Sequence, residues 1–262
     1  MLKYGQKLLN KIQTEVQKLK KVGTVYDSKK YLQYNAFSNT SDIVLMSVID
    51  NELAVLLIKR KEMPFEGCWA VPGGYVDSDK DEDALAAASR ELEEETGLKN
   101  IYLEQLYTFT KKGRDPRESI ANQKVRIWSV AHFALIDYTK AHAVAGSDAS
   151  EVKWFKISEL PELAFDHEKI IDMAIERVRG KISYSNVGFE LVPEEFTIPE
   201  LQAIFEKVIG EKLDRNNFRT KLLKMNILKE TGKSKEGGAG YPAPFYKLDR
   251  VKLASLKGRS LF

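Results

Sequence analysis

A short segment of this chain concentrates charges at a spacing that suits phosphate chemistry. Its charged set is Arg90, Glu91, Glu94 and Glu95. Ala, Leu and Glu dominate the surrounding residues and Gly97 follows them, which predicts a helix over residues 82–96. Spacings of three and four positions place the four side chains on neighbouring parts of one helical surface. Carboxylates packed this closely repel one another unless a cation lies between them, and Mg²⁺ takes oxygen ligands and works with phosphate substrates.

The wider segment resembles the signature of the Nudix hydrolases. That signature is Gly, five residues, Glu, seven residues, then Arg-Glu-aliphatic-x-Glu-Glu-x-Gly-aliphatic, and residues 90–98 match its second half as Arg-Glu-Leu-Glu-Glu-Glu-Thr-Gly-Leu. Glu82 lies eight positions before Arg90, but seven residues separate it from Gly74 where the signature has five. A lone Glu-x-x-Glu-Glu would favour an exposed, charged surface helix. Here the Arg-Glu, Glu-Glu, Gly-aliphatic and preceding Pro-Gly-Gly elements agree together with the Nudix signature.

The resemblance implies a Mg²⁺-dependent pyrophosphohydrolase, with Mn²⁺ as an alternative cation. The expected metal ligands are Glu91, Glu94, Glu95 and Glu82. Arg90 would orient the glutamates through charge-assisted hydrogen bonds. The metal would lower the pKa of a bound water, which attacks phosphorus. Asp148 and Glu151 are the candidates for a general base, on their position alone.

A loop farther along the chain carries charges that suit a diphosphate. Gly and Pro mark residues 112–117 as a loop, in which Arg114 and Arg117 flank Asp115. Two such arginines can hold a diphosphate by bidentate contacts, although the isolated motif is more typical of a solvated turn. Nudix proteins of the ADP-ribose type contain a similar Gly-Arg-Asp-Pro-Arg segment and often end with one like residues 160–167. The resemblance therefore implies cleavage of a nucleoside diphosphate derivative, with ADP-ribose giving AMP and ribose 5-phosphate. The expected substrate-binding residues are Arg60, Gly74, Arg114, Asp115 and Arg117.

The surrounding elements predict a layered α/β domain. Residues 42–49 and 54–58 are apolar, β-branched runs joined by Asp50-Asn51, which is typical of a hairpin. Further strands are expected at 101–109, 125–135 and 152–155, and a closing amphipathic helix at 163–179 that His167 would cap or orient. A helix with strands on both sides in sequence is typical of layered α/β domains. The Nudix resemblance implies an α/β/α sandwich with a mixed sheet.

The C-terminal part predicts a second, basic domain. Thr197 and Glu200 have the spacing of a capping box at the start of a helix that Gly210 ends, and a second helix is expected over residues 215–225. A hairpin with a Gly/Lys/Ser loop follows, which is the order of a winged helix-turn-helix. Residues 197–262 hold fourteen Lys/Arg and seven Asp/Glu, a net +7 that suits the phosphates of double-stranded DNA. The expected DNA contacts are Arg215, Arg219 and Lys221.

This domain order is similar to that of Nudix-related transcriptional regulators of NAD and sugar metabolism. Residues 217–219 match their Asn-Phe-Arg core, whereas residues 240–243 read Gly-Tyr-Pro-Ala where that family has Gly-Arg-Pro-Ala. The resemblance implies an alternative function, a DNA-binding regulator that uses its Nudix domain to sense ADP-ribose or a related metabolite. A basic module that only packs or pairs subunits, on a housekeeping Nudix enzyme, is the third interpretation.

Composition sets the class and the boundaries. The chain has 262 residues, 43% of them hydrophobic, with a net charge of +3, as in a soluble protein of one large or two ordinary domains. The expected parts are an N-terminal amphipathic helix and lead-in at 1–35, a Nudix domain at 36–181 and a winged-helix-like domain at 182–262. The single cysteine, Cys68, excludes an intrachain disulfide and suits a reducing cytosol; its apolar neighbours predict a buried structural thiol.

The expected location is the cytoplasm. No apolar run approaches the roughly 20 residues needed to cross a membrane, and lysines interrupt the N-terminus too often for a signal peptide. We expect the apolar stripe of the N-terminal helix to pack on the domain or on a second subunit rather than on a membrane surface. The expected assembly is a homodimer.

Overall fold

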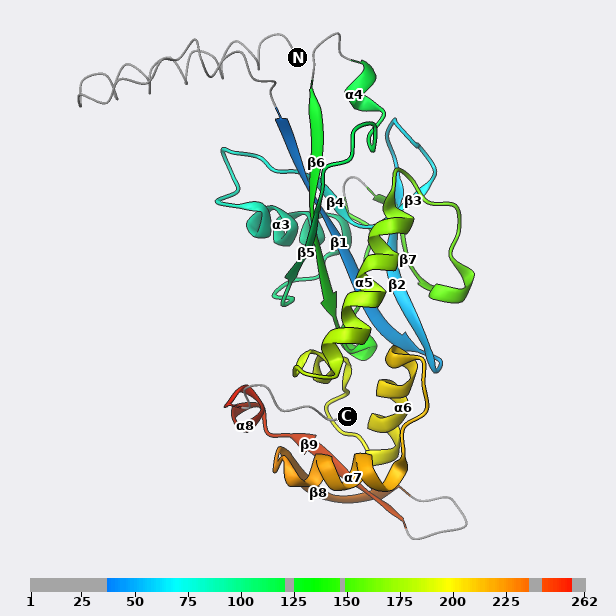
Figure 1. Ribbon diagram of the computed structural model, residues 1–262, viewed down its shortest axis with the longest axis vertical. Coiled ribbons are helices and arrows are strands. Elements are labelled where there is room, and N and C mark those ends of the chain that lie inside the picture. The colour runs from blue at the N-terminus through cyan, green and yellow to red at the C-terminus, as the bar shows by residue number, and fades with distance from the viewer. Residues whose placement is uncertain (1–36, 121–124, 147–148, 236–241, 256–262) are drawn as a thin grey trace, which may run out of the picture.

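The computed structural model describes residues 37–120, 125–146, 149–235 and 242–255. The predicted N-terminal helix and Asp148 lie outside these residues. Figure 1 shows a sheet domain above and a smaller domain of helices with a hairpin below. Within the described ranges, no helix is both long and apolar enough to span a membrane.

A seven-stranded mixed sheet forms the centre of the upper domain. Its strand order is β3-β2-β1-β6-β5, while β4 pairs with β1 and β7 pairs with β2. The pair β1–β6 is parallel and the other pairs are antiparallel. The strands are β1 Phe37–Ile49, β2 Glu52–Arg60, β3 Trp69–Ala70, β4 Gly73–Tyr75, β5 Glu104–Phe109, β6 Arg126–Leu135 and β7 Ala149–Lys156. Cys68, which was expected to be buried, is a free and half-buried thiol just before β3.

The predicted hairpin is confirmed, but its first strand is longer than predicted. Asp50 and Asn51 have φ of 49° and 62°, the left-handed conformation that a tight two-residue hairpin turn requires. β1 starts at Phe37 rather than at Asp42 because its polar first half pairs in parallel with β6, with Phe37 opposite Arg126. Because this partner strand is far along the chain, the residues around Phe37 carry no local hydrophobic pattern that predicts a strand.

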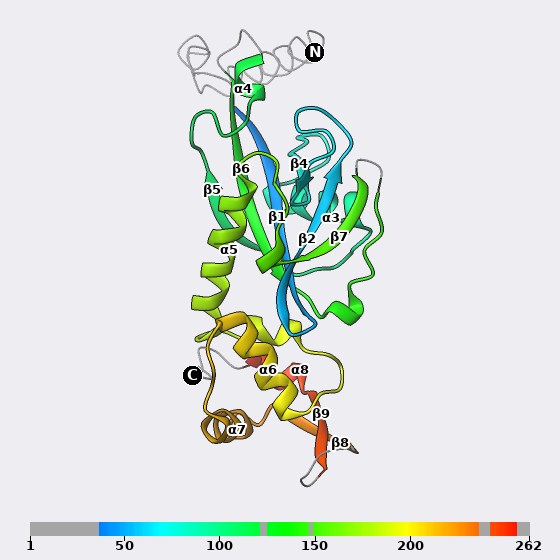
Figure 2. The same cartoon turned by 90° about the vertical axis from the view of Figure 1, so that its right-hand side faces the viewer.

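Alternating residues of β1 face two different helices. These helices are α3 (Ala84–Thr96) and α5 (His167–Ile182). Ile43 and Leu45 pack in the core cluster that contains residues of α3, while Val44 and Met46 pack in the cluster that contains residues of α5. Figure 2 shows the two helices on opposite sides of the sheet. The predicted α/β/α sandwich with a mixed sheet is therefore confirmed.

Both helices begin later than predicted, for local reasons. Asp83 caps α3 by accepting a hydrogen bond from the third residue of the helix, so Glu82 precedes the helix instead of starting it. Before α5, Phe165 has a φ of 55°, which a right-handed helix does not permit. His167 is consequently the first helical residue.

The second domain has the predicted order of a winged helix. Its elements are α6 Ile198–Ile209, α7 Arg215–Lys224, β8 Leu228–Lys235, β9 Ala243–Leu248 and α8 Arg250–Ser255. The capping box between Thr197 and Glu200 is present, and Gly210 ends α6 with a φ of 83°. The shorter helices of the chain are α4 Arg117–Ile120, η1 Tyr138–Lys140, η2 Ile157–Glu159 and η3 Val187–Leu191.

The two domains share one apolar core. A single cluster of buried residues runs from β1 and α5 through η3 and α6 to α7. At the junction, a Cβ on Gly188 would lie 2.6 Å from Cγ1 of Ile182, so only glycine allows η3 this close to the end of α5. Arg179 on α5 also donates a hydrogen bond to the carbonyl of Val208 on α6 at 3.2 Å. The winged helix therefore packs directly on α5.

Candidate functional site

Two adjoining cavities lie where β1 and β2 separate. β1 pairs with β2 over residues 46–49 and with β4 over residues 40–42. We call the first the arginine cavity, which is lined by Thr40, Asp42, Arg60, Arg114, Arg117 and Phe165 among others. The second is the glutamate cavity, lined by Gly74, Arg90, Glu91, Glu94, Glu95 and Arg117 among others. Arg60, Gly74 and Arg117 line both.

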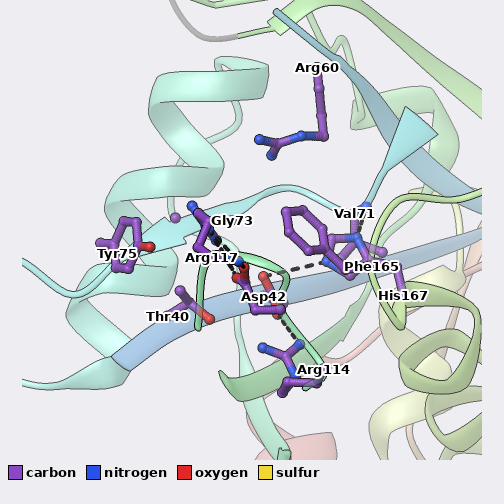
Figure 3. Close-up of a pocket in the computed structure, with 12 residues that line it drawn as sticks. Thr40, Asp42, Arg60, Val71, Gly73, Tyr75, Arg114, Arg117, Phe165 and His167 are labelled. Atoms are coloured by element: carbon purple, nitrogen blue, oxygen red, sulfur yellow. Dashed lines mark hydrogen bonds and ion pairs between the residues drawn. The ribbon is translucent and has the colours of Figure 1, made fainter. Parts of the chain in front are cut away.

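Arg117 lies against two aromatic rings. Its guanidinium carbon is 4.7 Å from the ring centroid of Tyr75 and 5.3 Å from that of Phe165. Figure 3 shows these three side chains around the arginine cavity. Asp115, which is buried, accepts hydrogen bonds from Nη2 of Arg117 at 2.6 Å and from its Nε at 3.0 Å. The aromatic rings and this carboxylate fix the guanidinium where both cavities meet.

Arg60 brings a second positive charge to the same place. Its guanidinium carbon is 4.9 Å from the ring centroid of Phe165, on the ring that Arg117 also contacts. Burial and the nearby charge of Arg117 lower the pKa of Arg60. The two guanidinium groups together make the local potential positive. This potential favours binding of an anion such as a diphosphate between them.

Arg114 lines the arginine cavity, but its guanidinium is held by carboxylates of the protein. Its side chain is 3% exposed, and its guanidinium donates to Asp166 at 2.7 and 3.2 Å and to Asp42 at 3.4 Å. Ser129 donates a further hydrogen bond to Asp42. These carboxylates hold the guanidinium, so Arg114 fixes the floor of the arginine cavity while Arg117 faces its space.

His167 connects α5 to the strand that enters the site. Its Nδ1 accepts a hydrogen bond from the backbone N–H of Val71 at 3.1 Å, so this nitrogen carries no proton. Burial lowers the pKa of His167, which favours the neutral imidazole. Its Nε2 lies 3.9 Å from Oδ1 of Asp42. The side chain therefore links the first residue of α5 to Val71, an arrangement that suits the orienting role expected for it.

On α3, Arg90 gathers the acidic side chains. Its Nη1 donates to Glu91 at 2.7 Å and to Glu94 at 3.1 Å. Its Nε and Nη2 form a bidentate pair with Asp81, both at 2.8 Å. The hydrogen bonds to Asp81 raise the pKa of Arg90 most, and the hydrogen bond to Glu91 raises it further. This geometry suits the orienting role expected for Arg90.

The contact of Arg90 with Asp81 was not predicted from the sequence. The expected acid, Glu82, is exposed and lines neither of the two cavities. Asp81 and Asp77 instead close the loop that carries two extra residues, with the backbone N–H of Asp77 donating to Asp81 at 2.8 Å. The acidic composition of this longer loop was the only signal in the sequence that could have pointed to Asp81.

The three glutamates line one cavity but are engaged by the protein itself. Glu95 accepts a hydrogen bond from the backbone N–H of Gly73 at 2.8 Å. A Cβ on Gly74 would collide with the carboxylate of Glu91, so a larger residue there would force this carboxylate to move. The donor set suits a hard divalent cation. Among the described residues, no group of three or more His, Cys, Asp or Glu side chains is already gathered around one point, so the three glutamates would have to turn toward one another to hold a cation.

Glu151 lies apart from these glutamates. It is on β7 opposite Lys59, with 3.8 Å between its carboxylate and the Lys59 ammonium, and it lines neither cavity. The structure therefore does not bring this candidate base together with the acids of α3.

The expected DNA contacts lie on the outer face of α7. Phe218 and Leu222 are buried, while Arg215 and Arg219 are exposed and Lys221 is half-buried. The capping carboxylate of Asp214 accepts from the backbone of the helix and not from these cations. In the parts of the chain that the structure describes, these three cations form no ion pair with an acid.

Both domains match known families. Residues 40–174 match the family model described as NUDIX domain, and residues 188–248 match the NrtR DNA-binding winged helix domain. The chain is similar to the ADPR responsive transcriptional repressor NtrR of Acinetobacter baylyi, with 34% identity over 212 residues, or 79% of this chain and 80% of that protein. It is also similar to the ADP-ribose pyrophosphatase of Methanocaldococcus jannaschii, with 37% identity over 152 residues, or 58% of this chain and 81% of the enzyme.

A solved structure extends this likeness across both domains. The crystal structure of Shewanella oneidensis NrtR complexed with a 27mer DNA superposes with a TM-score of 0.69 at 33% identity. The match covers 82% of this chain and 95% of that one. The arrangement of the sheet domain and the winged helix is therefore shared with a protein crystallised on DNA.

Proposed function

The chain belongs to the Nudix family and carries an NrtR-type winged-helix domain, and on this basis we propose that it is a DNA-binding regulator responsive to ADP-ribose. The observation that carries the proposal is the exposed basic face of α7, whose Arg215 and Arg219 have no acid partner in the described structure. Unpaired cations on the second helix of a winged-helix domain are available to DNA phosphates and bases. The proposal keeps the domain division expected from the sequence, with the boundary at residue 182, where α5 ends.

ADP-ribose as the ligand is supported by the arginine cavity and by the two relatives. One relative is named as ADPR responsive and the other as an ADP-ribose pyrophosphatase. In this chain, Arg60 and Arg117 would bind the diphosphate, and Asp115 would hold Arg117 in place. The rings of Tyr75 and Phe165, which already pack on these arginines, give the cavity an aromatic wall.

The DNA part of the proposal predicts that Arg219→Ala and Arg215→Ala each weaken binding to duplex DNA from upstream of the gene itself. Loss of one phosphate contact lowers the affinity by roughly tenfold and reduces the slope of log K against log salt by about 1. Fluorescence anisotropy at several salt concentrations measures both. Lys207→Ala is the matched control because it removes an exposed cation of the same domain from α6. Equal affinity of the Arg219→Ala and Lys207→Ala proteins would contradict a recognition role for α7.

Hydrolysis of ADP-ribose is the second candidate function. Glu91, Glu94 and Glu95 line the same cavity as Arg117, which places carboxylates beside a possible diphosphate. Nudix hydrolases generally use divalent metal ions, and Mg²⁺, with Mn²⁺ as the alternative, is the cation to supply.

If the chain is also an enzyme, it releases AMP from ADP-ribose only with a divalent cation, and Glu94→Gln slows release at least roughly tenfold, because one carboxylate is lost from the cavity. Liquid chromatography of the nucleotide products measures this rate. Glu93→Gln is the control on the same helix, since Glu93 pairs with Lys99 and lies outside the glutamate cavity. If no AMP is released from ADP-ribose with either cation, the hydrolase function is excluded and DNA-binding regulation is the remaining function.

A further inference from the structure

The cations of the wing, unlike those of α7, are held by acids of the same domain. Lys233 pairs with Glu195 at 2.9 Å, and Lys247 pairs with Glu194 at 2.9 Å. Two further contacts complete what we call the wing ion-pair array, Lys235 with Glu200 at 2.7 Å and Arg250 with Glu190 at 2.9 Å. Each cation of the array thus has a carboxylate within ion-pair distance.

The backbone places these acids beside the wing. Phe196 and Tyr246 exchange two backbone hydrogen bonds, of 3.0 and 2.8 Å, so that the chain at Phe196 lies directly beside β9. Phe196 is buried, which anchors the segment. Both views show the first turn of α6 next to the hairpin of β8 and β9 (Figures 1 and 2). The acids therefore meet the lysines because the fold holds the two segments together.

The array is ionised and exposed. A hydrogen bond from Lys247 lowers the pKa of Glu194, and one from Lys233 lowers that of Glu195. The side chains of Lys233 and Lys247 are 66% and 42% exposed. Exposed ion pairs contribute little to stability, so each lysine can exchange its carboxylate for a phosphate without loss of the fold.

We propose that Glu194 and Glu195 compete with DNA phosphates for the lysines of the wing. Because this inference rests on the proposed DNA-binding function, it concerns how strongly the domain binds DNA and not whether it does. A lysine held by a carboxylate gains less from a phosphate, since the first contact must be given up before the second forms. The acids thereby lower the affinity for double-stranded DNA of any sequence and leave α7 as the main source of binding.

The Glu195–Lys233 pair allows a direct test in the full chain with a duplex of random sequence. Glu195→Gln is expected to increase the affinity by roughly three- to tenfold and to steepen the salt slope by about 0.9, the value for one added phosphate contact. Lys233→Ala alone is expected to change the affinity less than about twofold, because this lysine is already occupied. In the Glu195→Gln background, Lys233→Ala is expected to remove most of the gain, because the other lysine near Glu195, Lys247 at 3.4 Å, keeps its shorter pairing with Glu194.

The controls separate competition from simple repulsion. Glu211→Gln removes the same charge from an exposed acid of the domain that makes no ion pair within the described ranges, and it is expected to change the affinity less than about twofold. Additive effects of Glu195→Gln and Lys233→Ala, or equal effects of Glu195→Gln and Glu211→Gln, would overturn the inference while DNA binding stands. Failure of the wild-type protein and every variant to bind DNA at low salt would overturn the proposed function as well.

Discussion

Replacing Arg114 by methionine is expected to lower the free energy of unfolding by about 3–5 kcal/mol, because two carboxylates then lose their shared cation in the protein interior. The side chain of Arg114 is 3% exposed, and those of Asp42 and Asp166 are 9% and 15% exposed. Methionine keeps much of the volume of the side chain but gives neither acid a donor. Urea unfolding followed by circular dichroism measures the change.

Two further variants keep this test decisive if the methionine protein does not fold. Arg114→Lys retains the charge but cannot donate to both carboxylates in the same way, so a smaller loss of about 1–2 kcal/mol is expected. Adding Asp166→Asn to Arg114→Met is expected to restore part of the lost stability, because one unpaired charge is removed. A methionine variant within about 1 kcal/mol of the wild-type protein would show that the buried pair has little effect on stability.

The contrast between Arg114 and Arg117 shows where the sequence was sufficient and where it was not. Both arginines lie in one loop and were expected to bind substrate. Both line the arginine cavity, but the guanidinium of Arg114 is held by Asp42 and Asp166, which lie 72 and 52 positions away from it in the chain. No local pattern identifies such partners, because burial and distant contacts decide them.

Elements with local causes were predicted more closely. The capping box at Thr197, the end of α6 at Gly210 and the hairpin turn at Asp50 each follow from side chains within a few residues. The first half of β1 depends on a strand far along the chain, and the partner of Arg90 depends on how a lengthened loop folds back. These two features required the structure.

The largest functional effect is expected from Arg117→Ala, which should weaken ADP-ribose binding by roughly 30- to 150-fold. Charge-assisted hydrogen bonds to a diphosphate contribute about 2–3 kcal/mol, and about 1.4 kcal/mol corresponds to tenfold in affinity. Isothermal titration calorimetry measures the loss. Arg126→Ala is the matched control, since its side chain is 28% exposed against 29% for Arg117 and it also pairs with a buried acid, Glu118. Equal affinity in the two variants would exclude the arginine cavity as the ligand site.

The same variant also tests how the ligand acts on DNA binding. Without ligand, Arg117→Ala is expected to bind DNA like the wild-type protein, because the arginine is in the sheet domain and α7 is not. If ADP-ribose changes the affinity for DNA by some factor, DNA must change the affinity for ADP-ribose by the same factor. If saturating ADP-ribose changes the DNA affinity of the Arg117→Ala protein by the same factor as that of the wild-type protein, Arg117 serves only to bind ADP-ribose. A reduced factor would show that contact with Arg117 is also needed to couple ligand binding to DNA binding.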